Sequence, residues 1–221
     1  MADHLEDDEQ LEALKRWWAE NGRSTIAAVV LAVGGTLGWQ QYQIWTDNQA
    51  ANAADAWANA QAQLASENPL QREQGEAAAK AIIGEFSNST YALFAGLQLA
   101  KMAVEDGDLA LAESYLRDAL VISGPESELG QLVQLRLARV LAANGDEAGA
   151  LAILSQSGDA MPIAYATARG DIHLAAGRQQ EALSAYLDAR AASLEMGNPP
   201  GLLDAKITSL GSRLSAQEQS S

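Results

Sequence analysis

The residues that could carry out acid–base chemistry are few and widely spaced in this chain. There are two histidines, His4 and His173, and there is no cysteine. Asp171 lies only two residues before His173, so the two side chains would point to different faces of a helix. We therefore expect His173 to pack or to line a groove rather than to act in catalysis. The lack of cysteine also excludes disulfides, thiolate metal sites and a lipid-modified cysteine.

Sequence motifs of catalysis and cofactor binding are absent as well. The sequence contains no glycine-rich phosphate loop, no serine elbow and no HExxH zinc pair. Its formal net charge is −15, from 29 acidic and 14 basic residues, so it should repel nucleic acid. We predict that the protein is not an enzyme and holds no cofactor or metal ion. It should bind neither nucleic acid nor a small-molecule substrate.

Small residues recur at regular intervals in the C-terminal part of the chain. Gly107, Gly145 and Gly177 each interrupt a helical pattern, and their separations are close to the period of about 34 residues of tetratricopeptide repeats. Small or apolar side chains recur seven residues before these glycines and five, nine and twelve residues after them. These positions are Ala100, Ala112, Leu116, Ala119, Ala138, Ala150, Leu154, Gly170, Ala182, Tyr186 and Ala189.

This spacing predicts stacked pairs of antiparallel helices. Two helices approach closely only where the facing side chains are small, and a glycine in the turn supplies the left-handed backbone that ends a helix. One helix pair cannot bury its apolar face alone, so successive pairs stack into a solenoid. We therefore predict an all-α protein with a tetratricopeptide-like α-solenoid. The alternative is an ordinary helical bundle in which the spacing arose by chance.

An apolar segment near the N-terminus predicts a single transmembrane helix. No charged residue occurs between Arg23 and Asp47. As a helix, Ile26 to Ile44 would rise about 28 Å, close to the roughly 30 Å of the hydrocarbon layer. Aromatic residues flank the segment, as at membrane interfaces: Trp17, Trp18, Trp39, Tyr42 and Trp45. A cleaved signal peptide and a buried core helix are the alternatives.

Basic residues on one side of this segment predict its orientation. Lys15, Arg16 and Arg23 precede it, and none follows before Arg72. The N-terminus should therefore stay in the cytoplasm and the rest should be exported. This makes the lipid bilayer a partner of the chain. Gly34 and Gly38 form a small-xxx-small pair against which another membrane helix could pack.

The predicted organisation has five parts. A cytoplasmic tail at 1–23 precedes the transmembrane helix at 24–46, and a stalk or first exported helix follows at 47–66. The repeat domain covers 67–211, and 212–221 form a disordered tail. Within the repeat domain we expect helices at 69–86, 91–106, 108–122, 127–144, 147–156, 162–176, 178–195 and 202–210.

Three stretches resemble one family in particular. They are "YALFAGLQLAKMAVEDGDLALAESYL" at Tyr91 to Leu116, "LRLARVL" at Leu135 to Leu141 and "RGDIHLAAGRQQEALSAY" at Arg169 to Tyr186. With the order of acidic tail, apolar segment and repeats, they resemble the YfgM family, ancillary subunits of the bacterial SecYEG translocon, over almost the whole chain. The resemblance implies a single-pass protein of the bacterial inner membrane whose C-terminal domain is periplasmic. It also implies two partners, the SecYEG translocon and a membrane-anchored periplasmic chaperone of the prolyl-isomerase type.

The function implied by this resemblance is that of a non-enzymatic, membrane-anchored adaptor of the protein-export translocon. The repeat domain would link the channel to periplasmic chaperone function. Two alternatives stay open. The chain could be an envelope scaffold for another membrane assembly, or a regulator whose acidic tail, Asp3 to Glu12, sequesters a basic cytosolic protein.

Overall fold

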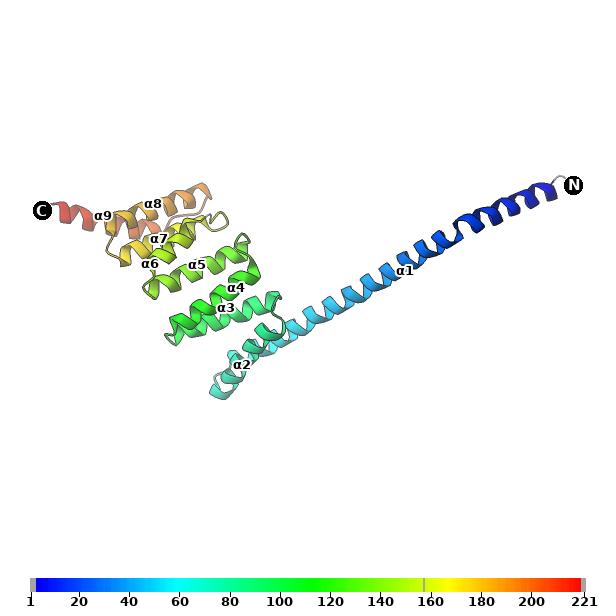
Figure 1. Cartoon of the computed structure of the whole chain (residues 1–221). Coiled ribbons are helices and arrows are strands. Elements are labelled where there is room, and N and C mark those ends of the chain that lie inside the picture. Colours follow the sequence, from blue (N-terminus) through cyan, green and yellow to red (C-terminus); the bar gives the residue numbers. More distant parts are fainter. Residues whose placement is uncertain (1–2, 157, 220–221) are drawn as a thin grey trace. The chain divides into compact units, whose positions relative to one another are not determined.

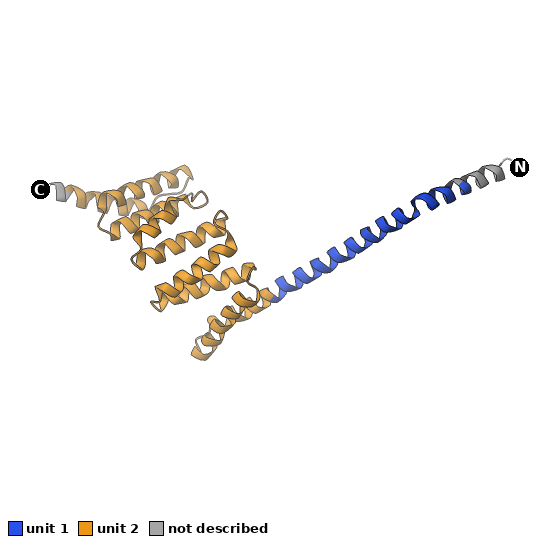
Figure 2. Ribbon diagram, in the orientation of Figure 1, with its two compact units in different colours: residues 1–52 blue, residues 53–221 orange. Residues whose placement is uncertain are grey.

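A computed structural model describes residues 3–156 and 158–219, and every regular element in this part of the chain is an α-helix. The all-α prediction is confirmed. The chain divides into two compact units, residues 1–52 and 53–221, and α1 begins in the first and ends in the second (Figures 1 and 2). The helices are α1 Asp3–Leu64, α2 Pro69–Glu85, α3 Thr90–Glu105, α4 Leu109–Ser123, α5 Glu128–Ala143, α6 Glu147–Ser155, α7 Pro162–Ala175, α8 Gln179–Glu195 and α9 Leu202–Gln219.

Capping side chains explain where five of these helices begin. Each accepts a hydrogen bond, 2.9–3.1 Å long, from a backbone N–H in the first turn of the helix that follows. Such N–H groups have no partner within the helix, so the cap stabilises the helix start. The capping residues are Asn68, Ser89, Asp108, Ser127 and Asp146.

Glycines with a left-handed backbone separate the two helices of three successive pairs. Gly107, between α3 and α4, has a φ angle of 81°, Gly145, between α5 and α6, one of 90°, and Gly177, between α7 and α8, one of 76°. The turn also closes with a backbone hydrogen bond into the preceding helix, for example from Asp146 N to Leu141 O at 2.9 Å. This arrangement satisfies carbonyl groups that the helix end leaves without a partner. The same turn therefore recurs once in each pair.

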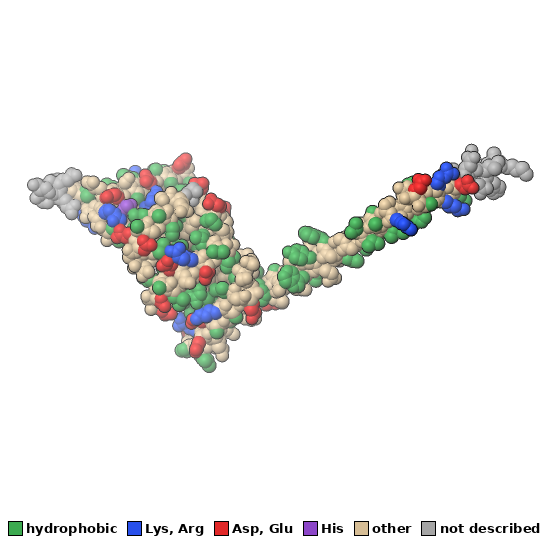
Figure 3. All heavy atoms as spheres, viewed as in Figure 1, with side chains coloured by type: hydrophobic (Ala, Val, Ile, Leu, Met, Phe, Trp, Pro, Cys, Tyr) green, Lys and Arg blue, Asp and Glu red, His purple; other side chains and the backbone are tan. Residues whose placement is uncertain are grey.

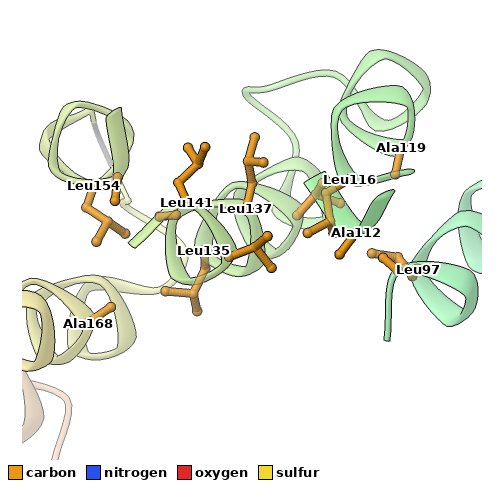
Figure 4. Packing of buried hydrophobic residues seen from close by; sticks show 14 of the residues in the cluster. Leu97, Ala112, Leu116, Ala119, Leu135, Leu137, Leu141, Leu154 and Ala168 are labelled. Carbon is orange, nitrogen blue, oxygen red and sulfur yellow. The ribbon is translucent and has the colours of Figure 1, made fainter. Parts of the chain in front are cut away.

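The core of the second unit consists mainly of leucine and alanine. Its largest buried cluster joins α3, α4, α5, α6 and α7. Figure 4 shows Leu97 of α3, Ala112 and Leu116 of α4 and Leu137 of α5 within this cluster. A second cluster joins α7, α8 and α9, and a third joins α2, α3 and the end of α1. Each helix pair thus covers an apolar face of the next, as in a repeat solenoid.

The predicted transmembrane helix is wrong. α1 runs through residues 24–46, but within 3–156 and 158–219 no helix is both long enough and apolar enough to cross a membrane. The strongly apolar run from Ile26 to Val33 is short, and the polar and glycine residues after it lower the mean hydropathy of any longer window. They are Gly34, Gly35, Gly38, Gln40, Gln41 and Gln43. The predicted single-pass inner-membrane localisation is wrong for the same reason, and the lipid bilayer as a partner stays a prediction.

The surface of the first unit is nevertheless rich in apolar side chains. Large hydrophobic residues from Ile26 to Trp45 are exposed on α1. In Figure 3 hydrophobic side chains lie along this part of the helix, and charged ones lie toward its N-terminal end. No helix end marks the predicted boundaries at residues 23 and 46. At the other end of the chain α9 extends to Gln219, and residues 1–2, 157 and 220–221 lie outside the described part.

Candidate interaction groove

A groove of about 800 Å³ lies in the second unit. Its lining comes from the end of α1, from α3 and from α5, with Leu116 contributed by α4. α3 and α5 are the first helices of two successive pairs. They run in the same direction, because each packs against α4, to which it is joined by a short connection. Positions that are equivalent in the two pairs therefore follow one another along the groove in the same order.

The apolar part of the groove is built from one repeated position. Phe94 on α3 and Leu132 on α5 both line it, and each lies thirteen residues before the turn glycine of its pair. Trp57 of α1 and Leu129 of α5 add to the apolar lining. The ring of Phe94 is held by Tyr91, whose ring packs edge-on at a centroid distance of 6.4 Å. Aromatic and leucine side chains of this kind supply apolar area that a partner can bury.

The basic part of the groove comes from a second repeated position. Lys101 on α3 and Arg139 on α5 each lie six residues before the turn glycine, and seven residues after Phe94 and Leu132. Seven residues are about two helical turns, so the basic groups lie on the same helix face about 10 Å beyond the apolar ones. Arg136 lies between Leu132 and Arg139 on α5.

These basic side chains are largely free to meet a partner. Lys101 forms an exposed ion pair with Glu105, with 3.6 Å between Nζ and Oε1, and such a pair contributes little stability. Neither Arg136 nor Arg139 forms an ion pair with any residue that the structure describes. The groove thus carries three basic groups and one acidic group in a chain whose net charge is −15.

In the third pair the equivalent position is acidic and already engaged. Asp171 of α7 accepts a hydrogen bond from the Tyr186 hydroxyl at 2.7 Å and pairs with Lys206 of α9. The Lys206 ammonium also lies 5.0 Å from the centre of the Tyr186 ring. Burial, together with the hydrogen bond to Asp171 and its charge, raises the pKa of Tyr186 above its usual value. The repeated basic position therefore occurs on α3 and α5 but not on α7.

The repeat positions singled out in the sequence lie inside the helix pairs rather than in the groove wall, apart from Ala100 and Leu116, which contribute to both. The structure buries Ala100, Ala112, Leu116, Ala119, Ala138, Ala150, Leu154, Gly170, Ala182, Tyr186 and Ala189. One close approach is between Gly170 and Tyr186. A Cβ atom at Gly170 would lie 2.5 Å from Cδ1 of the Tyr186 ring. Gly107, Gly145 and Gly177 occupy the turns.

Gly34 and Gly38 belong to the first unit and are exposed on α1. A Cβ atom added at either would have no described heavy atom within 4 Å, apart from the neighbouring backbone of its own helix. Their predicted role in helix packing stays a prediction.

His173 lies in a network of polar side chains. Its Nδ1 accepts a hydrogen bond from Nε of Arg178 at 3.0 Å, and Arg178 also pairs with Glu147 at 2.9 Å. This contact ties α7 to the start of α6 and α8. Asp171 has different partners, in keeping with its place on another face of α7. Among the described residues no cluster of three histidine, aspartate or glutamate side chains could hold a metal ion.

Among the lining residues, sequence reasoning identified only Ala100 and Leu116 and missed the exposed apolar and basic side chains of the groove. The signal was present, because an apolar or aromatic residue and a basic residue recur thirteen and six residues before both Gly107 and Gly145. Recognising it requires knowing that α3 and α5 run side by side on one surface. The small-residue pattern identifies the positions that pack within helix pairs. Most residues that line the groove do not belong to this pattern.

The fold and the groove define a repeat protein of the tetratricopeptide class, and a family model described as a tetratricopeptide repeat-like domain matches residues 15–212. Relatives over most of the chain carry the name ancillary SecYEG translocon subunit. The one from Haemophilus influenzae is 36% identical, covering 86% of this chain and 91% of the relative. The one from Aggregatibacter actinomycetemcomitans is 33% identical (86% and 91%), and the one from Escherichia coli 32% (81% and 85%). The chain belongs to this family of ancillary SecYEG translocon subunits, the YfgM family. No solved structure matches it significantly.

Proposed function

We propose that this protein is a non-enzymatic adaptor of the protein-export translocon and acts through its repeat domain. The observation that carries the proposal is the similarity to translocon subunits over nearly the full length of both chains. The family model matches the helices that build the groove and also α1 from Lys15 onward. A solenoid with an exposed groove is suited to holding partner proteins.

As a second step, the adaptor links the export channel to a chaperone of the prolyl-isomerase type. Support comes from the family resemblance, which implies such a chaperone as a partner, and from the presence of a groove large enough for a peptide segment. Holding a chaperone beside the channel exit would raise its effective concentration for chains that emerge there.

Copurification tests both steps. The full-length chain, carrying a C-terminal tag and made at its native level, is purified after mild crosslinking of intact cells, and the proteins that accompany it are quantified by mass spectrometry. We expect SecYEG subunits and a prolyl-isomerase-type chaperone well above an untagged control. If another envelope complex is recovered in their place, the scaffold alternative replaces this proposal. Recovery of SecYEG without the chaperone would retain the first step and remove the second.

A further inference from the structure

We propose that the groove of α1, α3 and α5 binds a segment of a partner protein in which an apolar anchor is separated by about 10 Å from acidic side chains. This inference rests on the proposed function and gives the chemistry of the partner that the adaptor holds. It follows from the order of side chains along two equivalent helices, the burial of the groove residues and the charge of the groove relative to the rest of the chain.

The positive charge of the groove favours the binding of acidic segments over neutral or basic ones. Lys101 of α3 and Arg136 and Arg139 of α5 place three positive charges in the groove lining, and Glu105 compensates only one of them. The chain as a whole carries a net charge of −15, so an acidic segment is repelled by the molecule at large and attracted at this place. Such an arrangement favours one docking site and disfavours others. A basic segment would meet like charges in the groove.

The apolar wall supplies the anchor site. Leu129 is 40% exposed, and Phe94 and Leu132 are only half-buried. Leu97 and Val140, which are buried, also line the groove. Apolar side chains gathered in one hollow and bordered by charges are typical of a protein-binding surface.

The spacing restricts the sequence of the bound segment. From Phe94 and Leu132 to Lys101 and Arg139 is about 10 Å along the helix axes. A bound helix covers that distance in about seven residues, and an extended chain covers it in about three. In both cases the apolar and acidic residues must be segregated along the segment, because interleaving would place acidic groups against Phe94 and Leu132 and leave the basic groups unmatched.

Designed peptides test this inference on the full-length chain. Three fluorescent peptides of about 16 residues are compared: one with leucines in one half and glutamates in the other, one with the same composition interleaved, and one with lysines replacing the glutamates. The segregated peptide is made in both sequence orders, because the structure does not restrict the direction of binding. Binding is measured by fluorescence anisotropy at low and at high salt.

A charge-reversal variant and a matched control complete the experiment. Arg136→Glu/Arg139→Glu reverses two of the three basic charges of the groove. Arg72→Glu introduces a charge change of the same kind on α2, outside the groove lining. All three arginines are exposed, so the variants should fold as the unsubstituted chain does, which circular dichroism verifies.

We expect the segregated acidic peptide to bind at least about tenfold more tightly than the interleaved and lysine peptides, with the preference falling at high salt. The double variant should lose that preference and Arg72→Glu should keep it. Equal binding of all peptides, or binding unchanged in the double variant, would overturn the inference. Self-association that competes with the peptide and depends on Arg136 and Arg139 would also overturn it, since the occupant would then be a second copy. None of these results alters the copurification of SecYEG subunits, which tests the proposed function separately.

Discussion

Gly170 determines how closely α7 and α8 approach. The Tyr186 ring is fully buried and packs directly against the backbone of Gly170, so no other residue type fits at this position without moving the ring. The same ring is held at its hydroxyl by Asp171 and on its face by Lys206. The ring therefore cannot swing aside, because three neighbours fix it.

Substituting Gly170 by alanine should destabilise the second unit. A methyl group would come within 2.5 Å of the ring, and overpacking of this kind costs about 1–3 kcal/mol, more than the roughly 1 kcal/mol that alanine gains over glycine in a helix. Gly84→Ala is the control, because no described heavy atom outside the local backbone lies within 4 Å of its Cβ position and the change should leave stability equal or slightly higher. Urea unfolding measures both. Equal midpoints for the two variants would show that the contact is not tight.

Tyr186 should also make stability depend on alkaline pH. Its pKa is raised in the folded protein, so the native state keeps the phenol proton at a pH where the unfolded chain, with a pKa of 10.0, has lost it. Stability is therefore fully present below pH 10 and falls above it, by about 1.4 kcal/mol per pH unit from this residue. The free energy of unfolding, measured from pH 8 to 11, should fall more steeply for the unsubstituted chain than for Tyr186→Phe. Parallel curves would contradict the assignment.

For single residues, the sequence predicts which ones are packed but not which polar side chains contact them. The glycine-based period identifies Gly170 and Tyr186 because both recur at a fixed distance from a turn. It does not identify Lys206, which lies in α9 after the last repeat and reaches Asp171 only once α7, α8 and α9 are folded together. A contact between residues so far apart in the chain leaves no local spacing to detect.

Among the helices, beginnings are easier to predict than ends. The starts of α2, α6, α7 and α9 agree with the sequence prediction, since a proline or a capping side chain marks most of them. α9 continues beyond Leu210 through Gly211 to Gln219, because one glycine inside a helix costs only about 1 kcal/mol and Leu214 still packs against the cluster of α7, α8 and α9. Helix ends instead follow from turn geometry, and that geometry recurs at Gly107, Gly145 and Gly177.

The turn between α5 and α6 provides a test of this dependence on glycine. Gly145 has a φ angle of 90°, which side chains with a Cβ atom rarely adopt. Gly145→Ala should therefore lower the free energy of unfolding by about 1–2 kcal/mol, although a Cβ atom there would touch nothing. Gly145→Asn should cost less, because asparagine tolerates the left-handed region better. If alanine and asparagine cost the same, the loss arises from something other than backbone conformation.

Two buried glutamines of α5 form hydrogen bonds with residues after α6, which the repeat pattern does not predict. Gln131 and Gln134 of α5 are only 7% and 5% exposed. Oε1 of Gln131 accepts a hydrogen bond from the backbone N–H of Ala160, and the Tyr165 hydroxyl of α7 lies 2.9 Å from both Gln131 O and Gln134 Oε1. Satisfied in this way, the amides can be buried at little cost, and they join α5 to α7 across the short helix α6.

For the whole molecule, the helical class and the repeat family follow from the sequence, whereas two features do not. The apolar segment at 26–44 has the length and aromatic flanks of a membrane span, but its glycines and glutamines leave it too polar. The groove escaped prediction because it is a property of three helices together. Phe94, Leu132, Lys101 and Arg139 are ordinary surface residues until α3 and α5 run in the same direction beside one another.

Photocrosslinking from the groove in living cells tests most directly whether the groove of this translocon-subunit relative is its working surface. A photoreactive residue replaces Gln98 or Arg136, both of which line the groove, and Arg72 on α2 serves as the control position. Crosslinked partners are identified by mass spectrometry of the purified full-length chain. We predict crosslinks to SecYEG subunits or to a prolyl-isomerase-type chaperone from the two groove positions and much weaker ones from Arg72. Equal crosslinking from all three positions, or no crosslink to either partner from the groove, would contradict this prediction.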